Sequence, residues 1–114
     1  MSLNKVMIIG NCGKDAEMRY TASGTATAQV SVAVNNRRKN SQGEYEDQTE
    51  WFSVVLWNET AERLSQYLTK GKQVYVEGRL QTRSWEDDSG QKHYRTEVVA
   101  NTVQLLGGRQ TDSE

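Results

Sequence analysis

The segment TEWFSVVLWNETAERLSQYLTKGKQVYVEG, residues 49–78, changes its hydrophobic period twice. Side chains of residues 48–57 alternate between two faces, which is typical of a β-strand. Apolar residues within 61–68 then recur at i, i+3 and i+7, the spacing of one helix face, and period two returns at 74–80. The segment therefore predicts a strand, a short helix over about residues 59–69, and a further strand.

Three segments outside this stretch also have strand character. Residues 5–10 are a short apolar run with β-branched members, and residues 26–35 alternate with period two. A last strand is expected from about 92 to 100, with Val103 and Leu105 available to extend it. Residues 35–43 are polar and have no period, so we expect a loop at the tip of an extended hairpin.

The order of elements is three strands, one helix and two strands. Five short antiparallel strands with one helix before the fourth match the OB-fold, whose face and loops bind oligonucleotides or oligosaccharides. We therefore expect an all-β protein, a five-stranded OB-fold Greek-key barrel with one short α-helix between strands 3 and 4. The 114 residues fit one domain. We expect residues 1–107 to form it and residues 108–114 to be a disordered C-terminal end.

The composition argues against several classes of protein. The longest uncharged apolar run, Val6–Ile9, is far shorter than the ~20 residues of a membrane span. The N-terminus lacks the features of a signal peptide, so we expect a cytoplasmic protein. The single Cys12 cannot form an internal disulfide, and with the single His93 it cannot build the usual zinc site. We expect no metal and no cofactor.

Catalytic residues are hard to assign. A nucleophile needs a base within hydrogen-bonding reach, usually a histidine, and His93 lies roughly 80 positions from Cys12. The sequence contains neither a G-x-S-x-G nor a Walker motif. Asp87 and Asp88 precede Ser-Gly and are better interpreted as turn residues than as metal ligands. We therefore expect no enzyme and assign no catalytic residue, although a small hydrolase or nuclease remains a third hypothesis.

The net charge of −1 hides an uneven distribution. Residues 1–40 and 63–85 have an excess of basic side chains, whereas residues 41–62 contain six acidic and no basic ones. A mixed, solvated surface is the simpler interpretation of this pattern. The alternative is that folding brings the two basic segments together in one groove.

The three tryptophans have polar or charged neighbours, which is unusual for this residue type. A tryptophan in a strand is ordinarily a core residue. Trp51 and Trp57, roughly 20 Å apart along one strand face, share that face with threonine and serine, whereas Phe52, Val54 and Leu56 form a better apolar face. Trp85 stands between Arg83-Ser84 and a run of acidic residues. These contexts favour exposed rings.

Basic residues are interleaved with these aromatic residues along the sequence: Arg37, Arg38, Lys39, Lys70, Lys72, Arg79 and Arg83. Aromatic rings that stack on bases, combined with cations for phosphates, are what sequence-independent binding of single strands requires. Each stacked base is worth about 1–3 kcal/mol. Two alternatives remain open here: the tryptophans could lie in a core or subunit interface, and Arg37 and Arg38 could belong to a plain solvated loop.

Several ordered motifs resemble those of the bacterial single-stranded DNA-binding protein family, from about Asn4 to Gly108. The matching pieces are Asn4-Lys5-Val6, residues 10–20, Thr49-Glu50-Trp51, residues 67–71, residues 74–80, Thr82-Arg83-Ser84-Trp85 and Thr96-Glu97-Val98. The resemblance implies an OB-fold subunit of a homotetramer that wraps single-stranded DNA in replication, recombination and repair. Such a protein is expected in the cytoplasm, associated with the nucleoid.

The resemblance also implies roles for individual residues. It places Trp51, Trp57 and Trp85 on bases, and Lys5, Lys70 and Arg83 along the DNA path. Together with the basic residues above, the candidate DNA-binding set is Trp51, Trp57, Trp85, Lys5, Arg37, Arg38, Lys70, Lys72, Arg79 and Arg83. For Lys72 and Arg79, a DNA contact and a solvated face are equally compatible with the sequence.

Two departures from the family pattern qualify these expectations. Where members often carry another aromatic residue, this chain reads Asn36-Arg37-Arg38, so phosphate contacts or arginine stacking could replace a stacking ring. The chain ends at Thr111–Glu114 without the family's acidic tip, so recruitment of replication and repair proteins through a tip is not assumed. The alternative function is a dimeric OB-fold accessory protein of the primosome that binds partner proteins.

Overall fold

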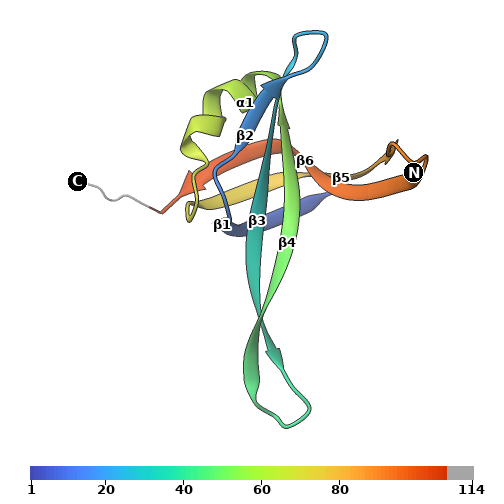
Figure 1. Cartoon of the computed structure of the whole chain (residues 1–114). Coiled ribbons are helices and arrows are strands. Elements are labelled where there is room, and N and C mark those ends of the chain that lie inside the picture. The colour runs from blue at the N-terminus through green and yellow to red at the C-terminus, as the bar shows by residue number, and fades with distance from the viewer. Residues whose placement is uncertain (108–114) are drawn as a thin grey trace.

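The computed structural model describes residues 1–107, which form six strands and one short α-helix (Figure 1). The elements are β1 (Val6–Cys12), β2 (Glu17–Tyr20), β3 (Ala26–Lys39), β4 (Tyr45–Trp57), α1 (Asn58–Leu64), the 3₁₀ turn η1 (Ser65–Tyr67), β5 (Gln73–Glu86) and β6 (Lys92–Leu106). The expected disordered end, 108–114, lies outside the described residues. Within the described part of the chain, no helix is long and apolar enough to cross a membrane.

Five of the strands close into a barrel in the order β1-β5-β6-β4-β3. The ring closes because β1 also pairs with β3, where Asn11 lies opposite Ala33. β4 and β6 run parallel, with Val54 opposite Val98, and the other pairings are antiparallel. The prediction of a five-stranded OB-fold barrel is thus confirmed, with its helix between β4 and β5, the third and fourth strands of the barrel. The expectation of antiparallel pairing throughout was wrong for β4 and β6.

A short strand, β2, was not predicted. After β1 the chain turns through residues 13–16 and then pairs with β3, from Glu17 opposite Gln29 to Tyr20 opposite Ala26. All four residues of β2 are exposed. Because neither face of β2 is buried, it has no apolar period for a sequence analysis to detect.

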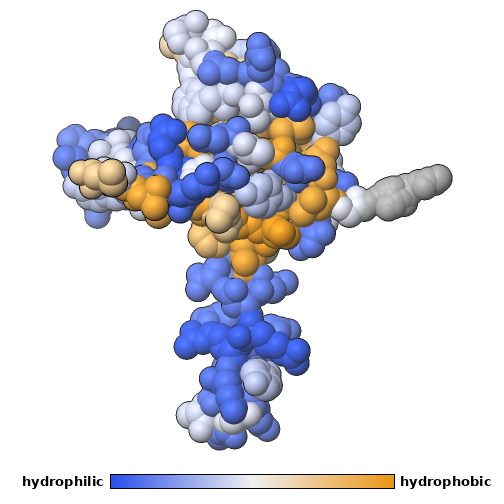
Figure 2. Space-filling view, turned by 180° about the vertical axis from the view of Figure 1, so that it is seen from behind, coloured by the Kyte–Doolittle hydropathy of each residue, from blue (hydrophilic) through white to orange (hydrophobic). Residues whose placement is uncertain are grey.

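The expected extended hairpin is present, but its loop is shorter than the predicted residues 35–43. β3 continues to Lys39 and pairs with β4 from Tyr45 onward, which makes a long two-stranded arm below the barrel in Figure 1. The arm is hydrophilic on its surface (Figure 2), because both of its faces meet solvent. A strand without a buried face shows no alternation of apolar and polar residues. The actual turn is short: the side-chain oxygen of Asn40 accepts hydrogen bonds from the backbone N–H groups of Gln42 and Glu44.

The helix is shorter than the expected 59–69 and packs against β3 and β4 at one end of the barrel. The three apolar residues that predicted it, Ala61, Leu64 and Leu68, are all buried. Leu68 reaches the core after η1, where the backbone tightens into a 3₁₀ turn. The apolar spacing therefore identified the correct core residues, although it overestimated the length of the helix.

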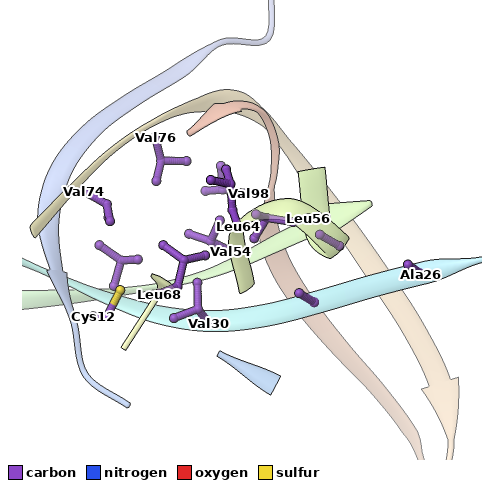
Figure 3. Packing of buried hydrophobic residues seen from close by; sticks show 13 residues of the cluster. Cys12, Ala26, Val30, Val54, Leu56, Leu64, Leu68, Val74, Val76 and Val98 are labelled. Carbon is purple, nitrogen blue, oxygen red and sulfur yellow. The ribbon is translucent and has the colours of Figure 1, made fainter. Parts of the chain in front are cut away.

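The core is built mostly from valine and leucine (Figure 3). The largest fully buried side chains are Val32, Val54, Leu56, Leu68, Val74, Val76 and Val98. Burying each such side chain stabilises the fold by about 1.5–3 kcal/mol. Gly10 and Gly78 lie where a Cβ atom would collide with the backbone of Ala33 and Val99, so the close approach of neighbouring strands requires glycine at both positions.

Candidate nucleic-acid interface

One outer face of the barrel carries the aromatic residues that the sequence singled out. In β4 the side chains alternate, so Val54 and Leu56 are fully buried while Trp51 and Trp57 point outward. The exposed fractions are 61% for Trp51, 40% for Trp57 and 41% for Trp85. The prediction that all three rings are exposed is confirmed, and the alternative that they fill this subunit's core is excluded.

Two hollows lie on this face. The first, of about 240 Å³, is lined by Trp57, Val55, Val99, Gln29, Arg83 and Glu97, among others, and we call it the Trp57 pocket. The second, also about 240 Å³, is lined by Lys14, Asp15, Glu17, Gln29, Val30, Ser31 and Arg95, and we call it the Arg95 pocket. Glu17 and Gln29 line both. The two pockets are therefore neighbours, and we refer to them together as the groove.

Trp57 stands where the strand changes into a helix. The next residue, Asn58, has a φ of 57° and begins α1. This left-handed conformation is uncommon outside glycine but is well tolerated by asparagine. The Trp57 ring lines the Trp57 pocket together with Val55 and Val99.

Trp51 rests against the backbone of another segment. A Cβ atom added to Gly13 would lie 2.5 Å from Cζ3 and 2.8 Å from Cη2 of the Trp51 ring. The end of the indole therefore packs directly on the Cα of Gly13. Lys14, the next residue in the chain, lines the Arg95 pocket. Trp51 thus stands beside that pocket, as Trp57 lines its neighbour.

A buried carboxylate holds Arg83. Glu97 is only 6% exposed, and its two oxygens accept hydrogen bonds from Nε and Nη2 of Arg83 at 3.4 and 3.2 Å. Gln29 donates to the same carboxylate at 3.4 Å and to Ser53 Oγ at 2.9 Å. The Arg83 guanidinium also lies 4.9 Å from the centre of the Trp85 ring, within the range of a cation–π interaction.

Trp85 has a second neighbour at the β5–β6 hairpin. The His93 ring stacks on it, with ring centres 5.5 Å apart and planes 20° apart. His93 Nε2 lies 2.7 Å from Asp87 Oδ2. This bond, followed by the Ser89 hydroxyl and the Gln91 backbone N–H, lowers the pKa of Asp87 to about 2. The turn that Asp87 organises therefore fixes the ring that stacks on Trp85.

The side chains of Arg37 and Arg38, which the sequence analysis considered as one candidate site, lie on opposite faces of β3. Neighbouring residues of a strand point to opposite faces. Arg37 shares the face of Trp51 and lies 5.5 Å from the centre of the Tyr45 ring. Arg38 belongs to the other face, where its Nη1 donates to Gln48 Oε1 at 2.7 Å. Arg37 and Arg38 therefore point to opposite faces of the arm.

Four other predicted basic residues line neither pocket: Lys5, Lys70, Lys72 and Arg79. Lys5 forms an ion pair with Glu77, and it is the main cause of the lowered pKa of that carboxyl. Lys72 Nζ donates to the Gly107 carbonyl at 3.4 Å. Arg79 Nη2 donates to Gln81 Oε1 at 3.3 Å. Two of the four bond residues of the pockets: Arg79 bonds Gln81, which lines the Trp57 pocket, and the Lys70 backbone N–H donates to Asp15 of the Arg95 pocket.

Sequence reasoning missed several residues of the groove. Lys14, Gln29 and Arg95 line it, and Glu97 is its buried carboxylate. The alternation of β6 could have placed Arg95 on the outer face, because it is two residues from Glu97 and three from the core residue Val98. Nothing local in the sequence signals that Glu97 is buried.

Metal chemistry finds no support in the described residues. Within 1–107, no group of three or more His, Cys, Asp or Glu side chains is arranged to hold a metal ion. Cys12 is buried, and burial raises the pKa of its thiol. The groove offers aromatic surface and hydrogen-bonding groups, and its lining contains both basic side chains and carboxylates.

A small OB-fold barrel with such a groove belongs to the class of modules that bind extended polymers such as oligonucleotides or oligosaccharides. The chain matches the Single-strand binding protein family over residues 3–106. It therefore belongs to that family. A curated relative, Single-stranded DNA-binding protein 1 of Chlorobaculum tepidum, is 49% identical over 108 residues, which are 94% of this chain and 67% of the relative.

Two solved structures are also similar. One is the Plasmodium falciparum SSB in complex with ssDNA, with a TM-score of 0.84 and 30% identity, covering 94% of this chain and 97% of that one. The other is a deletion mutant of the single-stranded DNA binding protein from Thermus aquaticus, with a TM-score of 0.83 and 33% identity. That match covers 94% of this chain and 52% of the other.

Proposed function

We propose that this protein binds single-stranded DNA without sequence preference and protects it in replication, recombination and repair. The observation that carries the proposal is the exposure of Trp51, Trp57 and Trp85 on the outer face that also carries the two pockets. Exposed indole rings are costly in water and useful to a ligand with flat apolar faces. Every base has such a face, so stacking tolerates any sequence. The names of the similar proteins support the same ligand.

The roles of individual residues follow from their place on the face. Trp57 offers a ring in the Trp57 pocket, Trp51 offers one next to Gly13, and Trp85 offers a third beside Arg83. The other basic residues of the predicted set would contact phosphates, with Arg37 favoured over Arg38 because it shares the face of Trp51. We infer that the protein acts by binding alone, and the family to which it belongs supports this. A DNA ligand also supports a cytoplasmic, nucleoid-associated location.

We further propose that the subunits assemble as a homotetramer. Among residues 1–107, β1 pairs with β5 along one edge, whereas along the other edge only Asn11 and Cys12 pair, with β3. Met7 and Ile9 on the outer face of β1 are 63% and 53% exposed. Figure 2 shows apolar surface gathered on the barrel above the base of the arm. An open strand edge beside exposed apolar side chains invites pairing with a second copy.

The dimeric accessory protein is the second candidate. One copy of the β1 contact produces a dimer, and a tetramer needs a further interface. Light scattering with and without oligo-dT separates the two, because the tetramer has twice the mass of the dimer. A stable dimer under all conditions would favour the accessory protein.

Tryptophan fluorescence tests the proposed ligand. Addition of oligo-dT at low salt is expected to quench the emission strongly, because bases stack on the three exposed rings. Added salt should release the DNA, with a slope of about −0.7 per phosphate neutralised in a plot of log affinity against log salt. Absence of quenching in a folded protein would contradict the proposal.

A further inference from the structure

Two arginines face each other across the β5–β6 pair. Arg83 lies directly opposite Arg95, and both belong to the outer face that carries the groove. Like charges in directly opposed positions of a sheet destabilise it. The repulsion between the two arginines is reduced if one of them is paired with a carboxylate. Among the described residues, the structure shows such a partner for Arg83 and none for Arg95.

The charge of Arg83 is already compensated. Both Nε and Nη2 donate to the carboxylate of Glu97, which is 6% exposed. A buried carboxylate needs a partner, because an isolated charge is costly away from water. Two parallel bonds also fix the plane of the guanidinium, which lies 4.9 Å from the centre of the Trp85 ring. The guanidinium of Arg83 is thus paired with Glu97 and packed against Trp85.

The charge of Arg95 is not compensated within residues 1–107. Its side chain is exposed, and the structure places no carboxylate within 4 Å of it in this part of the chain. Asp15 and Glu17 line the same pocket, but Asp15 accepts the Lys70 backbone N–H and Glu17 lies 4.0 Å from Arg19. Arg95 therefore presents its charge to the groove.

We propose that Arg95 is a phosphate-contacting arginine of this face, and that Glu97 is a positioning residue that holds Arg83 against Trp85. Arg83 then keeps a stacking ring in place and adds no net charge for a phosphate. The family resemblance had placed Arg83 along the DNA path as a cation, and this proposal gives it a different role. The inference rests on the proposed function, because both roles require a single-stranded DNA ligand: Arg95 contacts its phosphates and Arg83 holds a ring that stacks on its bases.

The salt dependence of binding separates the two kinds of arginine. Each phosphate neutralised contributes about 0.7 to the slope of log affinity against log salt. Arg95→Gln should therefore make the slope shallower by about 0.7. The double variant Arg83→Gln/Glu97→Gln removes a pair without net charge, so it should keep the wild-type slope and weaken binding by the same factor at every salt concentration. Glu97→Gln alone should free the Arg83 charge and make the slope steeper.

Four measures keep the test decisive. Replacing both partners avoids leaving a buried carboxylate without a cation, and circular dichroism checks the fold of each variant. If the double variant does not fold, Arg83→Lys keeps the charge beside Glu97 and loses the planar fork. It should then retain the slope and lose affinity equally at all salt concentrations. Oligo-dT of one length is used throughout, so that the number of phosphates is the same in every titration.

Specific results would overturn the inference. The double variant, or Arg83→Lys in its place, could flatten the slope as much as Arg95→Gln does. Arg95→Gln could leave the slope unchanged, or Glu97→Gln could fail to steepen it. Each of these would return the phosphate contact to Arg83 or remove the role of Glu97. Failure of the proposed function looks different, because the wild-type protein would then show no binding and no slope at all.

Discussion

Gly13→Ala should weaken DNA binding without harming the fold, because Gly13 is the surface on which Trp51 rests. An added Cβ atom would lie 2.5 Å from Cζ3 of the ring. Carbon atoms in contact normally stay about 3.5–4.0 Å apart, so this end of the indole must withdraw by roughly 1 Å. Trp51 is 61% exposed, which leaves the ring free to swing outward. The strain therefore moves the stacking ring and spares the barrel.

The expected magnitude follows from the worth of one stacked base. Stacking contributes about 1–3 kcal/mol per base, so complete loss at Trp51 weakens binding roughly 5- to 150-fold. Stability should change in the opposite direction. Gly13 does not have a positive φ, and at such sites Gly→Ala typically stabilises by about 0.4–1 kcal/mol through the unfolded chain. A loss of affinity with an equal or higher melting temperature is the expected signature.

A double-mutant cycle assigns the effect to Trp51. Affinity for oligo-dT is measured for wild type, Gly13→Ala, Trp51→Ala and the double variant. Gly13→Ala should cost little once Trp51 is absent, because the added methyl group then displaces nothing. Equal costs in both backgrounds would refute the reasoning, and so would a variant with unchanged affinity. Unfolding of Gly13→Ala would show that its Cβ strains the backbone.

Three further predictions concern other parts of the molecule. Arg37→Ala should make the salt slope shallower by about 0.7, whereas Arg38→Ala, the matched control on the opposite face, should leave it unchanged. The pKa of Asp87 is about 2 in the folded protein against an ordinary value of 3.8, so its contribution to stability is complete above about pH 4. That contribution should be lost as the pH falls toward 2, and an acid titration of tryptophan emission should detect the loss of order at the hairpin; His93→Ala should move this transition to higher pH. Ile9→Asp should dissociate the assembly, which light scattering measures directly, and an unchanged mass would place the interface elsewhere.

The barrel could be predicted from the sequence because its strands bury one face each. Alternation in residues 48–57 and helical spacing in 61–68 both follow from contact with a single core. β2 and the outer half of the arm lie beyond that core, so their sequences show no periodic pattern. The strand order and the parallel pairing of β4 with β6 are tertiary properties, which local periods do not contain.

Of the candidate site, the exposed tryptophans could be predicted from the sequence, but the pairing of the arginines could not. The tryptophans stood out because they share a strand face with polar residues, while the apolar residues beside them already account for the core. The cations gave no comparable signal. Whether an arginine is free or paired depends on residues from another strand, as Arg83 depends on Glu97 and Gln29. Charge counts along the chain therefore could not separate Arg83 from Arg95.

The three rings are held in different ways, and this should divide their contributions to binding. Trp51 rests on Gly13 and is the most exposed, whereas Trp57 shares its pocket with Val55 and Val99. Trp85 already has Arg83 and His93 against its ring, so a base that stacks there must displace one neighbour or share the surface that remains. A ring fixed before binding loses less conformational freedom when DNA arrives. Trp85 therefore has less free surface for a base but loses little conformational entropy on binding. Trp51 has the most free surface, and ordering its ring on binding costs more conformational entropy.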